Sequence, residues 1–217
     1  MKAIKEMLNL SHRVSQHVVG SEGNTSVRSG NYFYIKASGC SLSTLQEDEI
    51  IRCDLDGNQI NNFHLKPSLE TCFHSLLYKK TNCNYIVHTH PVETLKILCT
   101  NRVAQFSKER IFPDQVVFNG VESCVVKYAH PGQELMRSIQ ESIDKFFYEK
   151  KHFPNLILLQ NHGIICIGET VNKCVYSTDI CEKAANIFLT TGINFLSQSQ
   201  VNKIANDQRE KYRASKN

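Results

Sequence analysis

The chain contains 217 residues, of which 41% are hydrophobic and 21% are charged, a size and balance typical of one globular domain with a substantial core. Its net charge is only +4, part of that excess lies in the C-terminal stretch 209–216, and no dense basic cluster occurs elsewhere. The composition therefore argues against a nucleic-acid-binding protein.

The N-terminal half of the chain is predicted to combine helices and strands. Apolar residues at near-helical spacing indicate an amphipathic first helix, and short apolar runs between turn signals indicate strands. Pro67 marks the start of a later helix, since proline is favoured at the first helical position. The predicted elements are a helix over residues 2–18, strands over 25–28 and 32–37, a short helix from 43, a strand over 50–54, a helix over 68–80, a strand over 85–90 and a helix from 91.

The C-terminal half continues the same pattern. Its predicted elements are a β-rich segment over 111–128, a helix over 131–150, strands over 156–160 and 164–167, a helix over 171–189, and a polar helix or tail over about 196–217. Helices precede, interrupt and follow the strands, and neither a repeat nor a linker divides the chain. We therefore predict a single α/β domain over residues 1–217, with a mostly antiparallel sheet covered by helices.

Nine cysteines are scattered along the chain, and no two have the C-x-x-C spacing. This pattern argues against a disulfide framework or a cysteine-rich zinc knuckle, and favours free thiols in a reducing compartment. The N-terminus lacks the apolar run of a signal peptide, and no stretch approaches the roughly 20 apolar residues of a membrane span. We expect a cytoplasmic protein with no membrane partner.

Three histidines form a candidate metal site. His88 and His90 lie on one predicted strand, where alternate side chains point the same way, about 7 Å apart at their roots. His162 lies at the tip between two apolar strands, and the following Gly163 permits a sharp turn and a close approach. Three histidines that leave a position open are typical of catalytic zinc. The alternative is a set of strand and turn histidines that are hydrogen-bonded to the backbone.

Glu70 is the candidate acid/base residue. It follows Pro67 in the first turn of a predicted helix, where the helix dipole favours a negative charge. The alternative interpretation is an ordinary helix-start residue. His74 lies one turn later on the same face and is read as a packed histidine in preference to a supporting residue of the site.

Small, hydroxyl-rich turns provide candidate anion-binding loops. Residues 23–26 and the pair Ser38-Gly39 lie at strand ends, where exposed backbone N–H groups can bind a phosphate. Ser68, at a predicted helix N-terminus, can add to them. Ordinary turn chemistry is the alternative. The chain contains no Walker A or dinucleotide-binding fingerprint, so nucleotide chemistry has no support.

Taken together, these motifs resemble the class II aldolase/adducin family, and they follow the family's order over about residues 10–190. The motifs are Gly23-Asn24-Thr25-Ser26-Val27-Arg28, Lys36-Ala37-Ser38-Gly39, Lys66-Pro67-Ser68-Leu69-Glu70-Thr71 with His74, His88-Thr89-His90-Pro91, and Leu159-Gln160-Asn161-His162-Gly163. The resemblance implies an α/β/α three-layer fold around a central, mainly antiparallel sheet. It also implies a homotetramer with active sites between subunits.

The resemblance further implies roles for the motif residues. His88, His90 and His162 would hold Zn²⁺, although their chemistry also suits other divalent ions. Glu70 would shuttle a proton, which calls for a pKa nearer 7 than usual, supplied by partial burial. The implied substrate- or phosphate-binding residues are Asn24, Ser38, Gly39 and Ser68.

The implied activity is a zinc-dependent aldolase, a carbon–carbon lyase that cleaves a ketose phosphate or related hydroxy-carbonyl sugar through a zinc-stabilised enediolate. One departure bears on the substrate: the fuculose-phosphate aldolase branch has a second serine where this chain has Leu69, so one phosphate-binding hydroxyl is missing. Epimerase, dehydratase and decarboxylase relatives share the motifs and stay as alternatives. So does a non-catalytic, adducin-like binding module.

Overall fold

The computed structural model describes residues 2–61 and 64–216. The strands found among these residues are β1 (Asn24–Ser29), β2 (Tyr32–Lys36), β3 (Ile50–Asp54), β4 (Tyr85–Thr89), β5 (Cys124–Val126), β6 (Leu156–Leu159) and β7 (Gly163–Gly168). They form one sheet in the order β3-β2-β1-β4-β7-β6-β5. Neighbouring strands are antiparallel, except that β5 and β6 run parallel.

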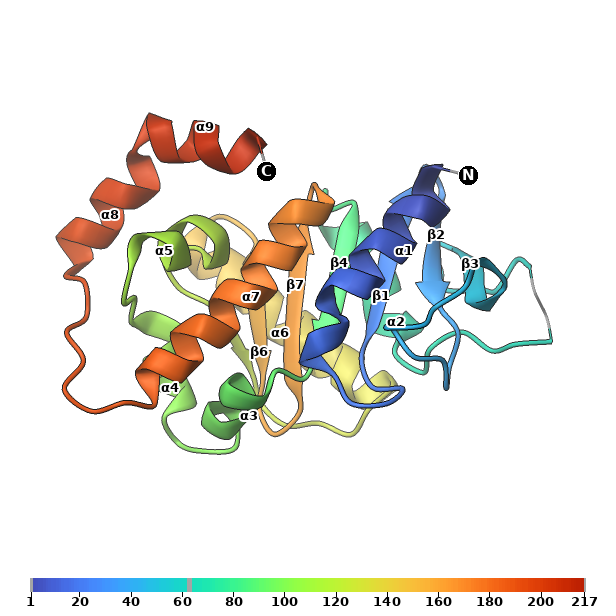
Figure 1. Cartoon of the computed structure of the whole chain (residues 1–217), viewed down its shortest axis with the longest axis horizontal. Helices are drawn as coiled ribbons and strands as arrows, with labels where there is room; N and C mark the ends of the chain where they lie inside the picture. Colours follow the sequence, from blue (N-terminus) through green and yellow to red (C-terminus); the bar gives the residue numbers. More distant parts are fainter. Residues whose placement is uncertain (1, 62–63, 217) are drawn as a thin grey trace.

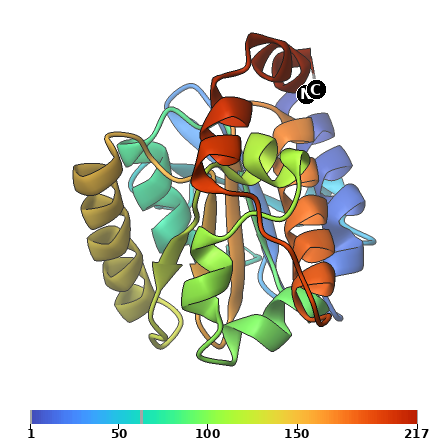
Figure 2. The ribbon, with the colours of Figure 1, turned by 90° about the vertical axis from the view of Figure 1, so that its left-hand side faces the viewer.

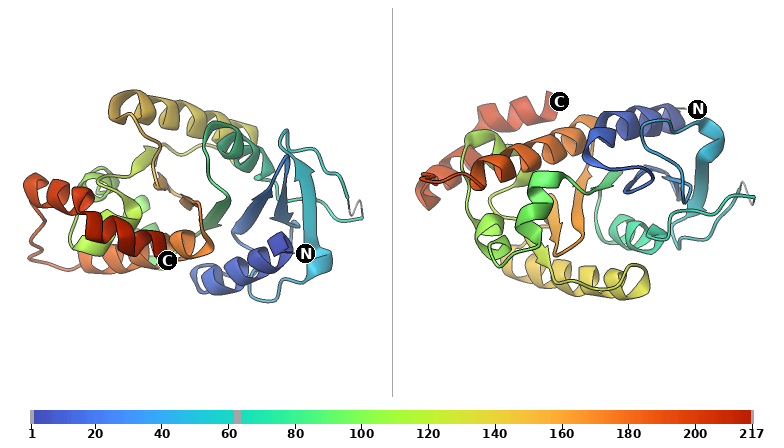
Figure 3. Two further views of the ribbon diagram at one scale, coloured as in Figure 1. Left: turned by 90° about the horizontal axis from the view of Figure 1, so that it is seen from above. Right: turned by 60° about the horizontal axis from the view of Figure 1, so that its bottom comes forward.

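Four helices cover the two faces of this sheet. Helices α1 (Lys2–Val14) and α7 (Val171–Phe188) lie on one face, and α2 (Thr71–Lys80) and α6 (Gln133–Lys150) lie on the other (Figure 1). The turned views show helices, sheet and helices as three successive layers (Figure 2, Figure 3). The predicted α/β/α fold with a mainly antiparallel central sheet is confirmed.

Both faces of the central strands are buried, as β7 illustrates. Ile164 and Cys166 pack in the core beneath α1 and α7, whereas Ile165 and Ile167 pack in the core beneath α2 and α6. Side chains alternate across a strand, so a strand between two helical layers must be apolar at every position. This explains the unbroken apolar run in the sequence and sets β4, the neighbour of β7, deep in the molecule.

The segment 111–128 is not β-rich, and that prediction is wrong. Pro113 begins helix α5 (Pro113–Asn119), and the strand β5 is confined to the last part of the segment. The buried residues of α5 recur at helical spacing, with Gln115, Phe118 and Asn119 on the inward side. A short apolar run has no decisive period in the sequence, and here tertiary packing against α7 decides its conformation.

Two other expected helices differ from the structure. The helix expected from residue 43 is replaced by a single 3-10 turn at Glu47–Glu49. The helix expected over 68–80 begins at Thr71, because residues 66–68 run extended beside β2. The N–H of Ser68 donates to the Lys36 carbonyl at 3.1 Å, and the N–H of Ser38 donates to the Lys66 carbonyl at 2.8 Å.

The remaining helices extend the domain beyond its three layers. They are the 3-10 turn η1 (Ser15–His17), α3 (Val92–Leu98), α4 (Val103–Lys108), α8 (Gln198–Asn206) and α9 (Gln208–Lys216). The polar C-terminal stretch thus forms two helices, which lie beside α5 in Figure 1. None of the described helices combines the length and apolar character needed to cross a membrane.

Candidate metal centre

The three predicted metal ligands come together at one end of the sheet. His88 lies on β4, His90 follows directly after this strand, and His162 lies in the turn between β6 and β7. Because β4 and β7 are paired neighbours, the turn at the start of β7 meets the end of β4. The ring centroids are 4.8 to 5.2 Å apart, and one ligand atom of each histidine lies within 4.8 Å of the others.

The chemistry of this cluster fits a divalent metal. His88 donates its Nδ1–H to the carbonyl of Ile164 at 2.9 Å, which turns Nε2 towards the cluster as the atom that would bind a metal. That Nε2 lies 3.1 Å from Nε2 of His90. Tetrahedral zinc with bonds of about 2.1 Å separates its ligand atoms by roughly 3.4 Å, so a small adjustment of the rings would accommodate the ion.

The protonation states of His90 and His162 also favour metal binding. Burial, and then the neighbouring His88 and His162, lower the pKa of His90 to about 4. Burial and then His88 lower the pKa of His162 to about 4. Both imidazoles are therefore neutral near pH 7, the state in which histidine binds a metal. Burial lowers the pKa of His88, but the Glu70 carboxylate more than offsets this and raises it.

Glu70 lies at the centre of the cluster. It occupies the position before α2, with Oε2 at 3.1 Å from Nε2 of His88 and Oε1 at 3.4 Å from Nε2 of His162. Burial raises the pKa of Glu70, but His88, His162 and a hydrogen bond from Asn24 lower it further, to well below its usual value. The expected pKa near 7 is therefore wrong for these surroundings, because the effect of burial is outweighed by the two histidines and the Asn24 hydrogen bond. Glu70 is a carboxylate at neutral pH.

A cavity of about 210 Å³ opens beside the cluster. It is smaller than the roughly 300–1,000 Å³ of pockets for drug-sized ligands, so it suits a small metabolite. Its wall contains Ser21, Gly23, Asn24, Lys36, Ser38, Gly39, Ser68, Leu69, Glu70, His90, Pro131 and His162. The four residues expected to bind substrate or phosphate thus line the same cavity as Glu70 and two of the histidines.

Lys36 was missed in the sequence interpretation, although it stands in the motif Lys36-Ala37-Ser38-Gly39. Its side chain is buried, and Nζ donates to the carbonyls of Ser21 at 2.7 Å and Cys40 at 2.6 Å. Burial lowers the pKa of Lys36 from its usual value, whereas Cys40 and Glu70 act to raise it. The signal that could have identified it is a lysine within a predicted apolar strand, because a buried ammonium group requires partners.

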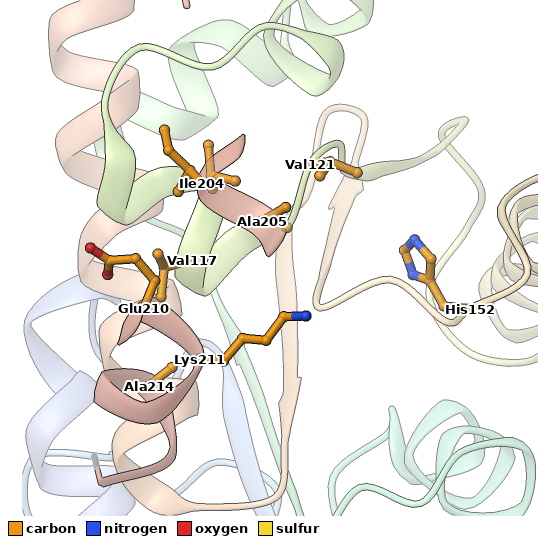
Figure 4. A pocket seen from close by; sticks show the side chains of 10 residues that line it. Val117, Val121, His152, Ile204, Ala205, Glu210, Lys211 and Ala214 are labelled. Atoms are coloured by element: carbon orange, nitrogen blue, oxygen red, sulfur yellow. The ribbon is translucent and has the colours of Figure 1, made fainter. Parts of the chain in front are cut away.

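A second cavity of about 240 Å³ lies away from His88, His90 and His162, between α5, α8 and α9. Figure 4 shows that it is lined by apolar side chains such as Val117, Ile204 and Ala205, with Lys211 and His152 at its border. Sites that bind polar metabolites bring several polar groups together on one point. This cavity lacks such a convergent group of polar residues.

Comparison with known proteins agrees with this architecture. An L-fuculose phosphate aldolase of Methanococcus maripaludis (strain C7) is 30% identical over 174 residues, which cover 79% of this chain and 87% of the relative. A 3-oxo-tetronate 4-phosphate decarboxylase of Haemophilus influenzae is 28% identical over 210 residues, 94% of this chain and 96% of the relative. A solved L-fuculose 1-phosphate aldolase superimposes with a TM-score of 0.79 at 19% identity, over 98% of this chain and 96% of that one.

The family assignment depends on how much of the fold is matched. The model of the Class II Aldolase and Adducin N-terminal domain matches residues 6–189, a span that begins in α1 and ends just after α7. It therefore includes all seven strands described above and the complete histidine cluster. The chain belongs to the class II aldolase and adducin N-terminal domain family.

Proposed function

We propose that this chain is a metal-dependent carbon–carbon lyase that acts beside the carbonyl of a ketose phosphate or a related hydroxy-carbonyl sugar. The observation that carries the proposal is the position of Glu70, a carboxylate that faces two candidate metal ligands and opens onto the cavity. Relatives named as L-fuculose phosphate aldolase support the same reaction class. The class II aldolase family model supports it as well.

His88, His90 and His162 would hold the metal, with zinc as the first choice and manganese or cobalt as alternatives. When bound, the ion supplies a Lewis acid that stabilises negative charge on the substrate oxygens. Glu70 takes or returns the proton on the reacting carbon. Its low pKa keeps it in the carboxylate form, which can accept a proton. Its two oxygens face Nε2 of His88 and Nε2 of His162.

Polar residues elsewhere in the cavity wall suit the anionic end of the substrate. Asn24, Ser68 and the Ser38-Gly39 turn supply amide, hydroxyl and backbone donors, and Lys36 adds a buried positive charge. Leu69 is 79% exposed and contributes no hydroxyl at the position where the fuculose branch has a serine. We assign the substrate phosphate to these residues. The positive charge of Lys36 would replace the attraction that a serine hydroxyl at position 69 supplies in the fuculose branch.

A decarboxylase is the second candidate. The decarboxylase relative aligns with 94% of this chain, whereas the first aldolase relative aligns with 79%. Loss of CO₂ from a 3-oxo acid leaves negative charge beside a carbonyl, so the same metal and phosphate wall serve both reactions. A dehydratase relative also occurs, at 28% identity over 139 residues. The intact histidines and Glu70 favour an enzyme over an adducin-like binding module.

A homo-oligomer, with four subunits as in the family, is part of the same proposal. Apolar side chains are exposed next to the cavity: Leu69 at 79% lies in its wall, and Val92 at 58% lies two residues after His90. Exposed apolar groups around a site are typical of a surface that a partner covers. A second subunit would close the cavity and provide the acid for the leaving oxygen.

The proposed function is tested first by metal content. Purified wild-type protein should contain about one zinc per chain by mass spectrometry, and His90→Ala should lose it. His152→Ala, which changes an exposed histidine outside the cluster, is the matched control. Absence of metal from the wild type after zinc is supplied would remove the Lewis acid and favour the binding module.

The reaction is then assayed with ketose 1-phosphates for retro-aldol cleavage and with 3-oxo acid phosphates for CO₂ release. Glu70→Gln should retain the metal and lose most turnover, by roughly 10²–10⁴-fold, because it removes the proton-transfer group. Full activity in Glu70→Gln would rule out its role. Turnover of only one substrate type decides between aldolase and decarboxylase.

A further inference from the structure

A buried chain of hydrogen bonds leads from α2 to Glu70 through His74. Nδ1 of His74 lies 2.7 Å from Oγ of Ser26, and Nε2 lies 2.5 Å from Oδ1 of Asn24. Nδ2 of Asn24 then donates to Oε2 of Glu70 at 2.8 Å and to Oγ of Ser68 at 3.1 Å. His74 and Ser26 are fully buried, so water does not compete for these bonds.

The fold explains why one imidazole reaches both partners. Asn24 and Ser26 are two residues apart on β1, so they share a face of the sheet at a spacing of about 7 Å. Helix α2 packs across that face and lays His74 between them, stacked on the adjacent Phe73 ring at 4.7 Å. Asn24 pairs directly with His88 on β4, which brings the amide to the metal ligands.

Each hydrogen bond in this series has a fixed direction from donor to acceptor. Oε2 of Glu70 accepts from Nδ2 of Asn24, so the amide turns its NH₂ group towards Glu70. Oδ1 of Asn24 then faces His74 and requires a proton on Nε2. Nδ1 of His74 is left as an acceptor for the Ser26 hydroxyl, which in turn accepts from the hydroxyl of Tyr78 at 2.7 Å. All donors point towards the carboxylate, an order that strengthens each bond.

We propose that His74 is a positioning residue, which holds the Asn24 amide in the one orientation that donates to both Glu70 and Ser68. Without the Nε2–H donor, rotation of the amide would place Oδ1 against the Glu70 carboxylate and leave that oxygen without its hydrogen bond. This inference rests on the proposed function, in which Glu70 transfers the proton and Ser68 helps to bind the substrate. A purely structural histidine would need neither this tautomer nor this orientation.

The first experiment reads the tautomer in the metal-free protein and does not depend on activity. Nitrogen-15 NMR of histidine-labelled protein near pH 7 should show His74, assigned by its absence from His74→Gln, as the neutral form protonated at Nε2. Protonation at Nδ1, or a doubly protonated ring, would overturn the inference, since Asn24 would then lack its donor. A failed proposed function leaves this result unaffected.

The second experiment compares two substitutions of His74 in the metal-loaded enzyme. His74→Gln keeps a side-chain N–H that can reach Asn24, whereas His74→Leu keeps the apolar bulk and removes the donor. We expect His74→Leu to retain its metal and to lose roughly 10–100-fold in kcat with a smaller change in KM, the size of effect typical of outer residues in metal sites. His74→Gln should recover most of the loss.

Ser75→Ala is the matched control, because Ser75 lies next to His74 on α2 and bonds a main-chain carbonyl of Leu55 with no link to Glu70. It should lower stability without changing kcat. Wild-type kcat in a folded His74→Leu protein would overturn the inference, as would a loss in His74→Gln as large as that in His74→Leu. Should His74→Leu fail to fold, the tautomer and the kcat of His74→Gln decide the question.

Discussion

The main chain of Gly163 lies directly against the imidazole of His90. A β-carbon at position 163 would fall 2.5 Å from Cδ2 of His90 and 2.5 Å from the carbonyl oxygen of Thr89. The left-handed residue of this turn is Asn161, with φ of 56°, and Gly163 itself is free of that constraint. Glycine at this position therefore serves close approach, and the sharp turn expected of it is made by Asn161.

Gly163→Ala should weaken metal binding. The added methyl group displaces the His90 ring, and a misplaced ligand is expected to lower zinc affinity by roughly 10–100-fold. A competition titration against a chelating dye measures this. Gly168→Ala is the control, because its β-carbon would meet Cys174 and Lys173 at the far end of β7. Equal zinc affinity in folded Gly163→Ala and wild type would contradict the prediction.

The candidate site could be predicted where local periodicity determines it. His88 and His90 share a face because of the two-residue repeat of a strand, and that inference needs no tertiary information. The approach of His162 depends on the pairing of β4 with β7, which joins residues far apart in the sequence. Residue type and the turn before Gly163 suggested His162 as the third ligand, and the resemblance to a family supported that grouping. Spacing alone carries no information on strand order.

The predictions that were wrong or incomplete also concern residues whose surroundings depend on distant parts of the sequence. Lys36 lies inside the predicted strand over 32–37, and its side chain is buried where the carbonyls of Ser21 and Cys40 meet it, which strand periodicity does not predict. The segment containing Val116 and Phe118 has an apolar run too short to distinguish strand from helix. The pKa of Glu70 depends on two histidines from other elements, so burial by itself gave the wrong direction.

Glu182→Ala should destabilise the fold. Glu182 on α7 accepts hydrogen bonds from the N–H groups of Glu93 and Thr94 and from the Thr94 hydroxyl, all at 2.9 Å. It thereby caps α3, the helix that follows His90. Loss of these bonds is expected to lower the free energy of unfolding by about 1–3 kcal/mol. Urea denaturation measures the change, with the exposed Glu141→Ala on α6 expected to stay within about 0.5 kcal/mol.

Lys36→Met should weaken the binding of anions in the cavity. The substitution keeps the apolar stem but removes the charge and the bonds to Ser21 and Cys40. A hydrogen bond to a charged group contributes about 1.5–3 kcal/mol, so inorganic phosphate should bind roughly 10–100-fold more weakly by calorimetry. Lys145→Met, whose side chain is 77% exposed, is the control. An unchanged affinity would remove Lys36 from the phosphate wall.

His74 also gives the stability of the metal-free protein a specific pH dependence. Burial is the largest influence and lowers the pKa of His74 from 6.5 to about 3, despite the opposing charge of Glu70. The unfolded chain therefore binds a proton at a higher pH than the native state does. Stability from this group is complete above pH 6.5 and is lost as the pH falls from there towards 3.

His74→Gln removes this titration and should make the protein less sensitive to acid. Between pH 6 and 4 the wild type should lose about 1.4 kcal/mol more per pH unit than the variant, because one extra proton is taken up on unfolding. His90 and His162 also have depressed pKa values, but they are common to both proteins and cancel in the difference. Urea denaturation of both metal-free proteins at pH 7, 6, 5 and 4 measures the two slopes. Parallel slopes would mean that native His74 takes up a proton over the same pH range as the unfolded chain, and the depressed pKa of His74 would then be wrong.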